Sequence, residues 1–174
     1  MKLQQESLYL IGFMGAGKTS VGNLLGDMCG LAVIDTDQVI EKQENMPIRD
    51  LFERHGEAYF RELETDVLQK LANGGAGAPA IITTGGGIIL KEKNRQLLKE
   101  SGRTIFLQCN PKVVVERLQQ DTTRPLIKNK TIEEINHMYQ MRLPLYLECA
   151  ITSIDTSAQS IKEVAESIKL RMNI

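Results

Sequence analysis

Residues near the N-terminus have the types and spacing needed to bind the phosphates of a nucleotide. The segment Gly12–Thr19, GFMGAGKT, fits G-x-x-x-x-G-K-[ST] without deviation. Its glycines would let main-chain N–H groups approach phosphate oxygens closely, because they carry no Cβ. Lys18 would place a positive charge at the β- and γ-phosphates, and Thr19 would offer its hydroxyl to Mg²⁺. The simpler interpretation is a glycine-rich turn before a core helix, with Lys18 solvated.

The sequence on either side of this loop favours phosphate binding. An apolar run, Leu8–Ile11, precedes the loop and is typical of a buried strand. Apolar residues then recur at helical spacing at Val21, Leu24, Leu25 and Met28. A strand, a glycine-rich turn and a helix N-terminus are the context in which the motif binds phosphate, since the helix directs its amides and its positive dipole end at the anion.

Two further clusters of chemically useful residues follow apolar runs. Asp35 and Asp37 come after Leu31–Ile34, and the glycines 85–87 come after Ala80–Thr84. In an extended chain, residues two apart face the same way, so both aspartates could reach one site. The alternative for Asp37 is N-capping of the following helix, and the alternative for the glycines is a plain strand-to-helix turn.

Strand and helix patterns alternate along the whole chain. The five expected strands are Leu8–Ile11, Leu31–Ile34, Ala80–Thr84, Thr104–Gln108 and Ile151–Ile154. This alternation predicts an α/β fold, with a parallel sheet covered by helices on both faces. Ligands of such sheets bind beyond the carboxyl ends of the strands, so the P-loop, the aspartates and the glycines should meet at one edge.

Local signals place several element boundaries. Pro47 suits the first turn of a helix that Gly56 should break, and a longer amphipathic helix should follow. Asn73–Pro79 is glycine-rich and is expected to be a loop. Thr131 and Glu134 have the spacing of a capping box.

Composition excludes several classes of protein. The chain has 174 residues, 42% hydrophobic and 25% charged, which predicts one domain over 1–174. With 21 Lys and Arg against 22 Asp and Glu, nothing suggests a general nucleic-acid or membrane surface. The three cysteines are scattered, which predicts reduced thiols. We find no signal-like N-terminus and no apolar run of transmembrane length, and we therefore expect a cytoplasmic protein.

A small kinase fits this length better than other P-loop proteins. A GTPase would need N-K-x-D, and the segment 129–132, NKTI, lacks the aspartate. A kinase also needs a mobile cover that excludes water from the phosphoryl group. The basic, aperiodic stretch around Arg124, roughly residues 117–131, is the predicted lid.

Six motifs together resemble the shikimate kinase family over essentially the whole chain. They are GFMGAGKTSVG, IDTD, the Phe60-Arg61-Glu62 run with Glu64, TGGG, TRPL from Thr123, and RLPLY from Arg142. The resemblance implies a three-layer P-loop fold with strand order 2-3-1-4-5 and a mobile lid. It implies transfer of the γ-phosphoryl group of ATP to the 3-hydroxyl of shikimate, in the route to chorismate and the aromatic amino acids. It also implies a monomer whose partners are shikimate and ATP.

The same resemblance assigns residues to the nucleotide and the metal. The P-loop residues that would bind ATP are Gly15, Ala16, Gly17, Lys18, Thr19 and Ser20. Arg117 and Gln159 would lie near the nucleotide, and Arg124 would reach the phosphates from the lid and stabilise charge during transfer. Thr19 and Asp35 would hold one Mg²⁺ per subunit, Asp35 through water. The simpler interpretation of Arg124 is loop solubility.

On the acceptor side the resemblance implies a site for a hydroxylated carboxylic acid. Asp37 would orient or deprotonate the attacking hydroxyl, and Arg61 and Arg142 would clamp the carboxylate. Gly85, Gly86 and Gly87 would bring backbone amides against the substrate. Simpler interpretations are a surface pair of Arg61 with Glu64 and a solvated Arg142 beside Pro144.

Two rival functions follow from the same residues. One is a small kinase for another acceptor, such as gluconate or a nucleoside monophosphate. The other is a catalytically idle nucleotide-binding regulator, although every residue that the chemistry needs is present. His55 and His137 match no catalytic position and are interpreted as surface or structural residues.

Overall fold

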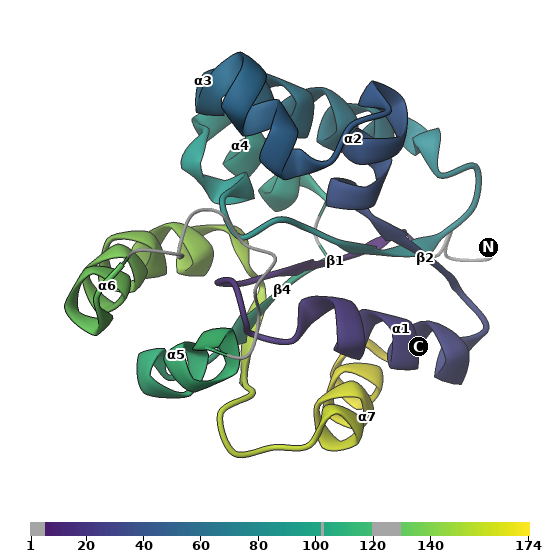
Figure 1. Ribbon diagram of the computed structural model, residues 1–174. Coiled ribbons are helices and arrows are strands. Elements are labelled where there is room, and N and C mark those ends of the chain that lie inside the picture. The colour runs from purple at the N-terminus through teal and green to yellow at the C-terminus, as the bar shows by residue number, and fades with distance from the viewer. Residues whose placement is uncertain (1–5, 102, 120–129) are drawn as a thin grey trace.

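Five parallel strands form the central sheet of the structure, a computed structural model that describes residues 6–101, 103–119 and 130–174 (Figure 1). The strands are β1 (Leu8–Ile11), β2 (Ala32–Asp35), β3 (Ala80–Thr83), β4 (Thr104–Gln108) and β5 (Thr152–Asp155). Their order is β2-β3-β1-β4-β5, as the family resemblance implied. Because all pairings are parallel, the carboxyl ends of the strands share one edge.

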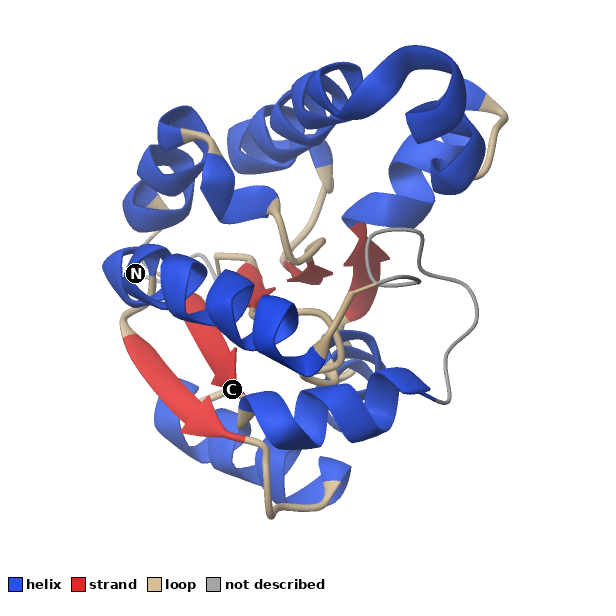
Figure 2. Ribbon diagram, turned by 60° about the vertical axis from the view of Figure 1, so that its left-hand side comes forward, coloured by secondary structure: helices blue, strands red, loops and turns tan. Residues whose placement is uncertain are grey.

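Helices cover both faces of this sheet and complete the predicted three layers (Figures 1 and 2). They are α1 (Lys18–Cys29), α2 (Thr36–Glu44), α3 (Ile48–Lys70), α4 (Glu92–Glu100), α5 (Pro111–Gln119), α6 (Ile132–Cys149) and α7 (Ile161–Met172). Helices α1 and α7 pack together on one face, whereas α2, α3 and α4 lie on the other. Helix α6 packs against both α4 and α5.

The three inner strands supply most of the core. Strands β1, β3 and β4 are almost fully buried because helices cover both of their faces, whereas the edge strands β2 and β5 are more exposed. This explains why the inner strands are continuous apolar runs rather than alternating ones.

Helix α1 approaches the sheet unusually closely. A Cβ on Gly22 would lie 2.5 Å from Thr83 Cγ2, and one on Gly26 would lie 2.4 Å from Val33 Cγ2. These two helical glycines therefore let α1 lie directly against β2 and β3.

One sequence argument about the aspartates is wrong. Strand β2 ends at Asp35 and α2 begins at Thr36, so Asp37 lies in the first helical turn rather than in extended chain. The cause is local: Asp35 Oδ1 accepts hydrogen bonds from the backbone N–H groups of Asp37 (3.0 Å) and Gln38 (3.2 Å). Asp35, not Asp37, is the N-cap of the helix.

Other boundaries differ less from expectation. Gly56 does break α3, with φ 81° and ψ 170°, and the capping box of Thr131 and Glu134 is present. The predicted loop over residues 73–79 instead begins as a π-helical turn, Leu71–Gly75, that continues α3. A 3₁₀ turn, Ile88–Leu90, separates the glycines from α4, and α6 continues past Pro144 to Cys149.

The single-domain boundary 1–174 stays a prediction. Most of the predicted lid, including Arg124, lies outside the described residues. Among the helices of the described ranges, none combines the length and the apolar character needed to cross a bilayer.

Candidate active site

The P-loop begins where β1 ends, at the carboxyl edge of the sheet. Gly15 (φ 77°) and Gly17 (φ 93°) have the left-handed backbone conformation that glycine adopts without strain. Gly17 immediately precedes α1, so the first amides of α1 face the loop. Within the loop Ala16 is buried, whereas Ser20, in the first turn of α1, is exposed.

Lys18 is held by the loop itself. Its Nζ donates hydrogen bonds to the carbonyl oxygens of Gly12 (2.7 Å) and Phe13 (2.9 Å), and its side chain is buried. The interpretation of Lys18 as a solvated cation is therefore wrong. The loop curves around a positive charge, which is the arrangement that a phosphate site requires.

Two residues from distant elements hold the P-loop from outside. Arg117 on α5 donates to the carbonyl oxygens of Gly15 and Thr156, both at 3.0 Å. The buried hydroxyl of Thr156 donates to Ala16 O at 3.1 Å. No sequence signal identified Thr156, a single threonine after β5. Gln159, in the same connection, is exposed and donates to Asp155 O at 2.6 Å.

Thr19 and Asp35, the predicted metal ligands, lie side by side. Thr19 Oγ1 donates to Asp35 Oδ2 at 3.2 Å, and Thr83 Oγ1 donates to the same oxygen at 2.9 Å. A hydroxyl and a carboxylate are the oxygen ligands that Mg²⁺ prefers, and Mg²⁺ completes its shell with water and substrate phosphates rather than a full protein cage. The donor set fits a phosphate-bound Mg²⁺, although no group of three or more His, Cys, Asp or Glu forms a metal cluster in the described part of the chain.

The second cluster forms around the three glycines that follow β3. A Cβ on Gly85 would lie 2.8 Å from Asp37 Oδ1 and 2.9 Å from Glu64 Oε1. A Cβ on Gly87 would lie 2.3 Å from Arg61 Nη1. Carboxylates from α2 and α3 and a guanidinium from α3 therefore all reach the backbone of this segment, and only glycine leaves room for them.

Arg61 is buried rather than exposed. It forms ion pairs with Glu64 Oε2 (2.6 Å) and Glu57 Oε1 (2.9 Å), and Glu64 is fully buried. The pair with Glu64 that the simpler interpretation expected is thus present, but it lies inside the site instead of on the surface.

Burial governs the ionisation of this pair. Loss of solvent raises the pKa of Glu64 from 4.5 to about 7, an effect that Arg61 opposes and Asp37 reinforces. Burial lowers the pKa of Arg61, but Glu64 and Glu57 outweigh it and the net change is upward. Glu64 Oε1 has no hydrogen-bond partner among the described residues. A polar group of a ligand could therefore occupy a ready-made hydrogen-bonding position.

Arg142 and Tyr146 on α6 complete the acceptor side. Arg142 is only 8% exposed and lies over the Phe13 ring, 5.6 Å from its centroid, so it is not the solvated cation of the simpler interpretation. Tyr146 is fully buried, and its hydroxyl donates to Gly86 O at 2.5 Å. Burial raises the pKa of Tyr146 and keeps it neutral. Tyr146 ends the RLPLY motif, and no role for it was predicted from the sequence.

The two clusters are in contact. A Cβ on Gly86 would lie 3.1 Å from Met14 N in the P-loop. The P-loop, with the Thr19 and Asp35 oxygens beside it, thus adjoins a cluster of two carboxylates and two arginines. Fold and site together define a small P-loop kinase.

Comparison with known proteins identifies the family. The family profile described as "Shikimate kinase" matches residues 14–173. A shikimate kinase of Bacillus cereus (strain AH187) is 43% identical over 168 residues, covering 97% of this chain and 99% of the relative. That of Thermodesulfovibrio yellowstonii is 40% identical over 164 residues, covering 94% and 92%. The chain belongs to the shikimate kinase family.

Solved structures agree with this assignment. The shikimate kinase of Acinetobacter baumannii, in complex with shikimate, gives a TM-score of 0.89 at 33% identity, over 97% of this chain and 93% of the other. The enzyme of Aquifex aeolicus gives 0.82 at 34% identity, over 96% of each. A gluconokinase of Sinorhizobium meliloti, at a TM-score of 0.53 and 20% identity, shares the fold alone. The activity is therefore that of a shikimate kinase, an ATP-using enzyme of the shikimate pathway.

Proposed function

We propose that this chain transfers the γ-phosphoryl group of ATP to the 3-hydroxyl of shikimate in one in-line step, without a covalent enzyme intermediate. One observation carries the proposal: Asp37, Glu64 and Arg61 converge on the glycine segment 85–87, whose middle residue touches the P-loop. A hydroxyl bound there would lie next to the terminal phosphate. Catalysis then rests on positioning and on neutralisation of charge.

The nucleotide side would work through the P-loop backbone and Lys18. When ATP binds, Lys18 would exchange its contacts with the carbonyls of Gly12 and Phe13 for the β- and γ-phosphates. Thr19, and Asp35 through water, would hold one Mg²⁺ per subunit. When bound, this ion neutralises charge on the phosphates. Arg117 donates a hydrogen bond to Gly15 O, which supports a role in holding the loop as well as a position near the nucleotide.

The acceptor side would hold shikimate by its carboxylate and its hydroxyls. Arg61 and Arg142 supply buried positive charge for the carboxylate. Asp37 would accept a hydrogen bond from the attacking hydroxyl and orient or deprotonate it. The similar Acinetobacter baumannii enzyme was solved in complex with shikimate, which supports the same substrate here. Arg124 lies outside the described residues, and its contribution from the lid is part of the proposal.

An assay of ADP release separates this function from its rivals. Release should depend on shikimate and not on gluconate or AMP. Release with gluconate or AMP at a comparable rate would overturn the substrate, and no acceptor-dependent release would favour the idle regulator. Asp37→Asn should lower kcat strongly with little change in the KM for ATP. Near-normal turnover would remove Asp37 from its role.

Two further proposals concern the state of the protein. A monomer is expected, and light scattering after size exclusion would measure its mass against the 19.5 kDa of one chain. A cytoplasmic location, with no nucleic-acid or membrane partner, is proposed from composition and tested by fractionation of cells.

A further inference from the structure

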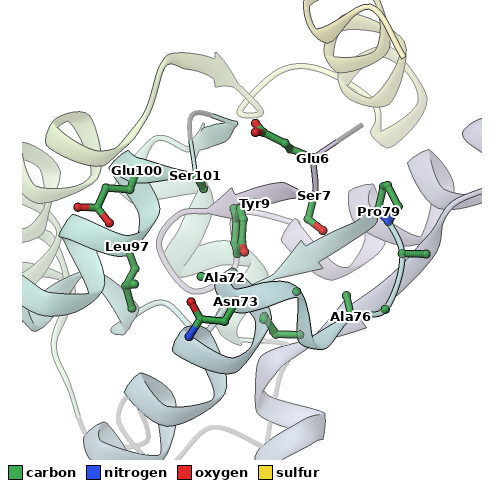
Figure 3. A pocket seen from close by; sticks show the side chains of 14 residues that line it. Glu6, Ser7, Tyr9, Ala72, Asn73, Ala76, Pro79, Leu97, Glu100 and Ser101 are labelled. Atoms are coloured by element: carbon green, nitrogen blue, oxygen red, sulfur yellow. The ribbon is translucent and has the colours of Figure 1, made fainter. Parts of the chain in front are cut away.

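A cavity lies at the edge of the sheet opposite the P-loop (Figure 3). Its walls come from the start of β1, the π-helical turn with the loop leading to β3, and the end of α4. The volume is about 510 Å³, within the range of roughly 300–1,000 Å³ typical of small-molecule sites. Residues that matter for its chemistry are Glu6, Tyr9, Leu71, Asn73, Leu97 and Glu100. None of them belongs to the site described above.

Tyr9 gives this cavity a hydrogen-bonding group. Its side chain is 3% exposed and lines the cavity, with the hydroxyl directed toward the turn that carries Ala72 and Asn73 (Figure 3). The hydroxyl opens onto the cavity and is not one of the buried polar atoms that lack a partner among the described residues. Burial raises the pKa of Tyr9, so the phenol stays neutral and can donate or accept.

The charged side chains that line the cavity are carboxylates, and the Arg103 guanidinium lies beside Glu6, donating to Glu6 O at 3.4 Å. Glu6 and Glu100 carry exposed carboxylates at its rim, and Glu100 also accepts a hydrogen bond from the Gln96 amide at 2.8 Å. Among the described residues that line the cavity there is no Lys, Arg or His. Leu71 and Leu97 add apolar surface. The cavity thus combines a mixed polar and apolar lining, a tyrosine hydroxyl that opens into it and two carboxylates at its rim.

From these features we infer that the cavity binds a small organic cation: an amine on an apolar body that carries a hydroxyl at its far end. The ammonium group would face Glu6 and Glu100 at the rim, and the hydroxyl would pair with Tyr9 in the interior. An anion of the same shape would be repelled by the rim. This site would be separate from the ATP and shikimate sites, and the inference does not depend on their assignment.

Tyramine is a suitable probe because its ammonium group and its hydroxyl lie at opposite ends of the molecule, with an aromatic ring between them. Three matched compounds each change one feature: phenethylamine lacks the hydroxyl, 4-ethylphenol lacks the ammonium group, and 3-(4-hydroxyphenyl)propanoate reverses the charge. Titration of the full chain, followed in ¹H–¹⁵N NMR spectra, should shift the side-chain amide of Asn73 and the backbone amides of Gly74, Gly77 and Ser101. The dissociation constant of tyramine should be lower than that of each other compound by a factor of about three or more.

Two variants test the contacts one at a time. Tyr9→Phe should weaken tyramine about threefold to tenfold and leave phenethylamine nearly unchanged, because only tyramine uses the hydroxyl. Glu100→Gln should weaken both amines by the same factor and leave 4-ethylphenol unaffected. Glu92→Gln, at the other end of α4, is the matched control and should bind all compounds as the parent does.

Three results would overturn the inference. In the first, the anion binds as tightly as tyramine. In the second, Tyr9→Phe loses the same factor of affinity for tyramine and for phenethylamine. In the third, the NMR chemical shifts change only at residues outside the cavity. Tyr9→Phe keeps the ring and nearly all of the volume, so it should fold, and its dispersed spectrum will show that it does.

Discussion

The phosphate side of the site is made mainly of backbone, whereas the acceptor side is made of charged side chains. At the P-loop, one continuous segment provides amides from the loop and from the start of α1, with Lys18 as its buried cation. At the acceptor side, Asp37 comes from α2, Arg61 and Glu64 from α3, and Arg142 from α6. These side chains meet only after the helices have packed on the sheet.

This difference has consequences for substitution. Backbone amides bind phosphate only when the loop keeps its conformation. A side-chain substitution in the loop therefore affects phosphate binding mostly by changing that conformation. The acceptor side instead depends on paired charges in a buried place, where loss of one partner leaves the other uncompensated. Changes on the two sides should therefore alter different kinetic constants.

The largest effect is expected at Lys18, the buried cation of the P-loop. Lys18→Ala should lower kcat/KM by about 10²–10³-fold, because it removes a positive charge from the transferring phosphate. Steady-state kinetics with ATP and shikimate will measure this. Lys162→Ala is the control, since Lys162 is 76% exposed and forms only a long pair with Glu166. A loss below about fivefold in Lys18→Ala would mean that backbone amides alone support phosphate binding.

Gly87→Ala should act on the acceptor side alone. Its Cβ would lie 2.3 Å from Arg61 Nη1 and would displace the guanidinium, so the KM for shikimate should rise by up to about 10²-fold. The KM for ATP should change little. Gly30→Ala introduces backbone strain at φ 65° without a new contact, and it should lower stability while leaving both KM values near normal. If Gly87→Ala raised the KM for ATP as much as the KM for shikimate, the acceptor side and the phosphate side would not respond separately to substitution.

Acidity should affect the acceptor side through Glu64. Its pKa in the folded protein is about 7 against an ordinary 4.5. The protonated carboxyl is therefore favoured by folding, and this stabilisation is fully present below pH 4.5 and lost as the pH rises to about 7. The total loss is about 3 kcal/mol. Glu64→Gln keeps a neutral group and should not show this loss, so its advantage over the parent in the free energy of unfolding should grow across this range. Parallel curves in urea unfolding would show that Glu64 is ionised throughout.

The smallest effect concerns the outer support of the P-loop. Arg117→Ala removes the hydrogen bond to Gly15 O, and the KM for ATP should rise about threefold to tenfold with the KM for shikimate unchanged. Arg171→Ala provides a matched control, because Arg171 also donates to a carbonyl of the β5 region but far from the loop. If the two variants behave alike, Arg117 has no particular role at the nucleotide.

Sequence analysis predicted the fold and the phosphate side well for a physical reason. Apolar runs of the inner strands and the contiguous motif Gly12–Thr19 are local features, so the strands and the loop lie where the sequence predicts them, whereas the strand order was implied by the family resemblance. The turn at Asp35 was missed because a capping carboxylate competes with continuation of the strand, and the sequence alone did not decide between them. The support from Thr156 was missed because its partner, Ala16, is 140 residues away in the chain.

The acceptor side depended more on family resemblance. Taken by itself, Arg61 with Glu64 three residues later is a common surface pattern of a helix, and nothing in that spacing indicates burial. Burial follows from where α3 packs, and the space for the guanidinium follows from the absence of a side chain at Gly87. Both are properties of the assembled fold.

The contact of Gly86 with Met14 has a thermodynamic consequence for how the enzyme meets its two substrates. Since the segment that receives shikimate touches the loop that receives ATP, an ordering of one should be transmitted to the other. Linkage requires such an effect to be reciprocal: if shikimate tightens the binding of a nucleotide analogue, the analogue must tighten shikimate by the same factor. Calorimetric titrations in both orders would measure that factor, and equal affinities with and without the second ligand would show that the two halves bind independently.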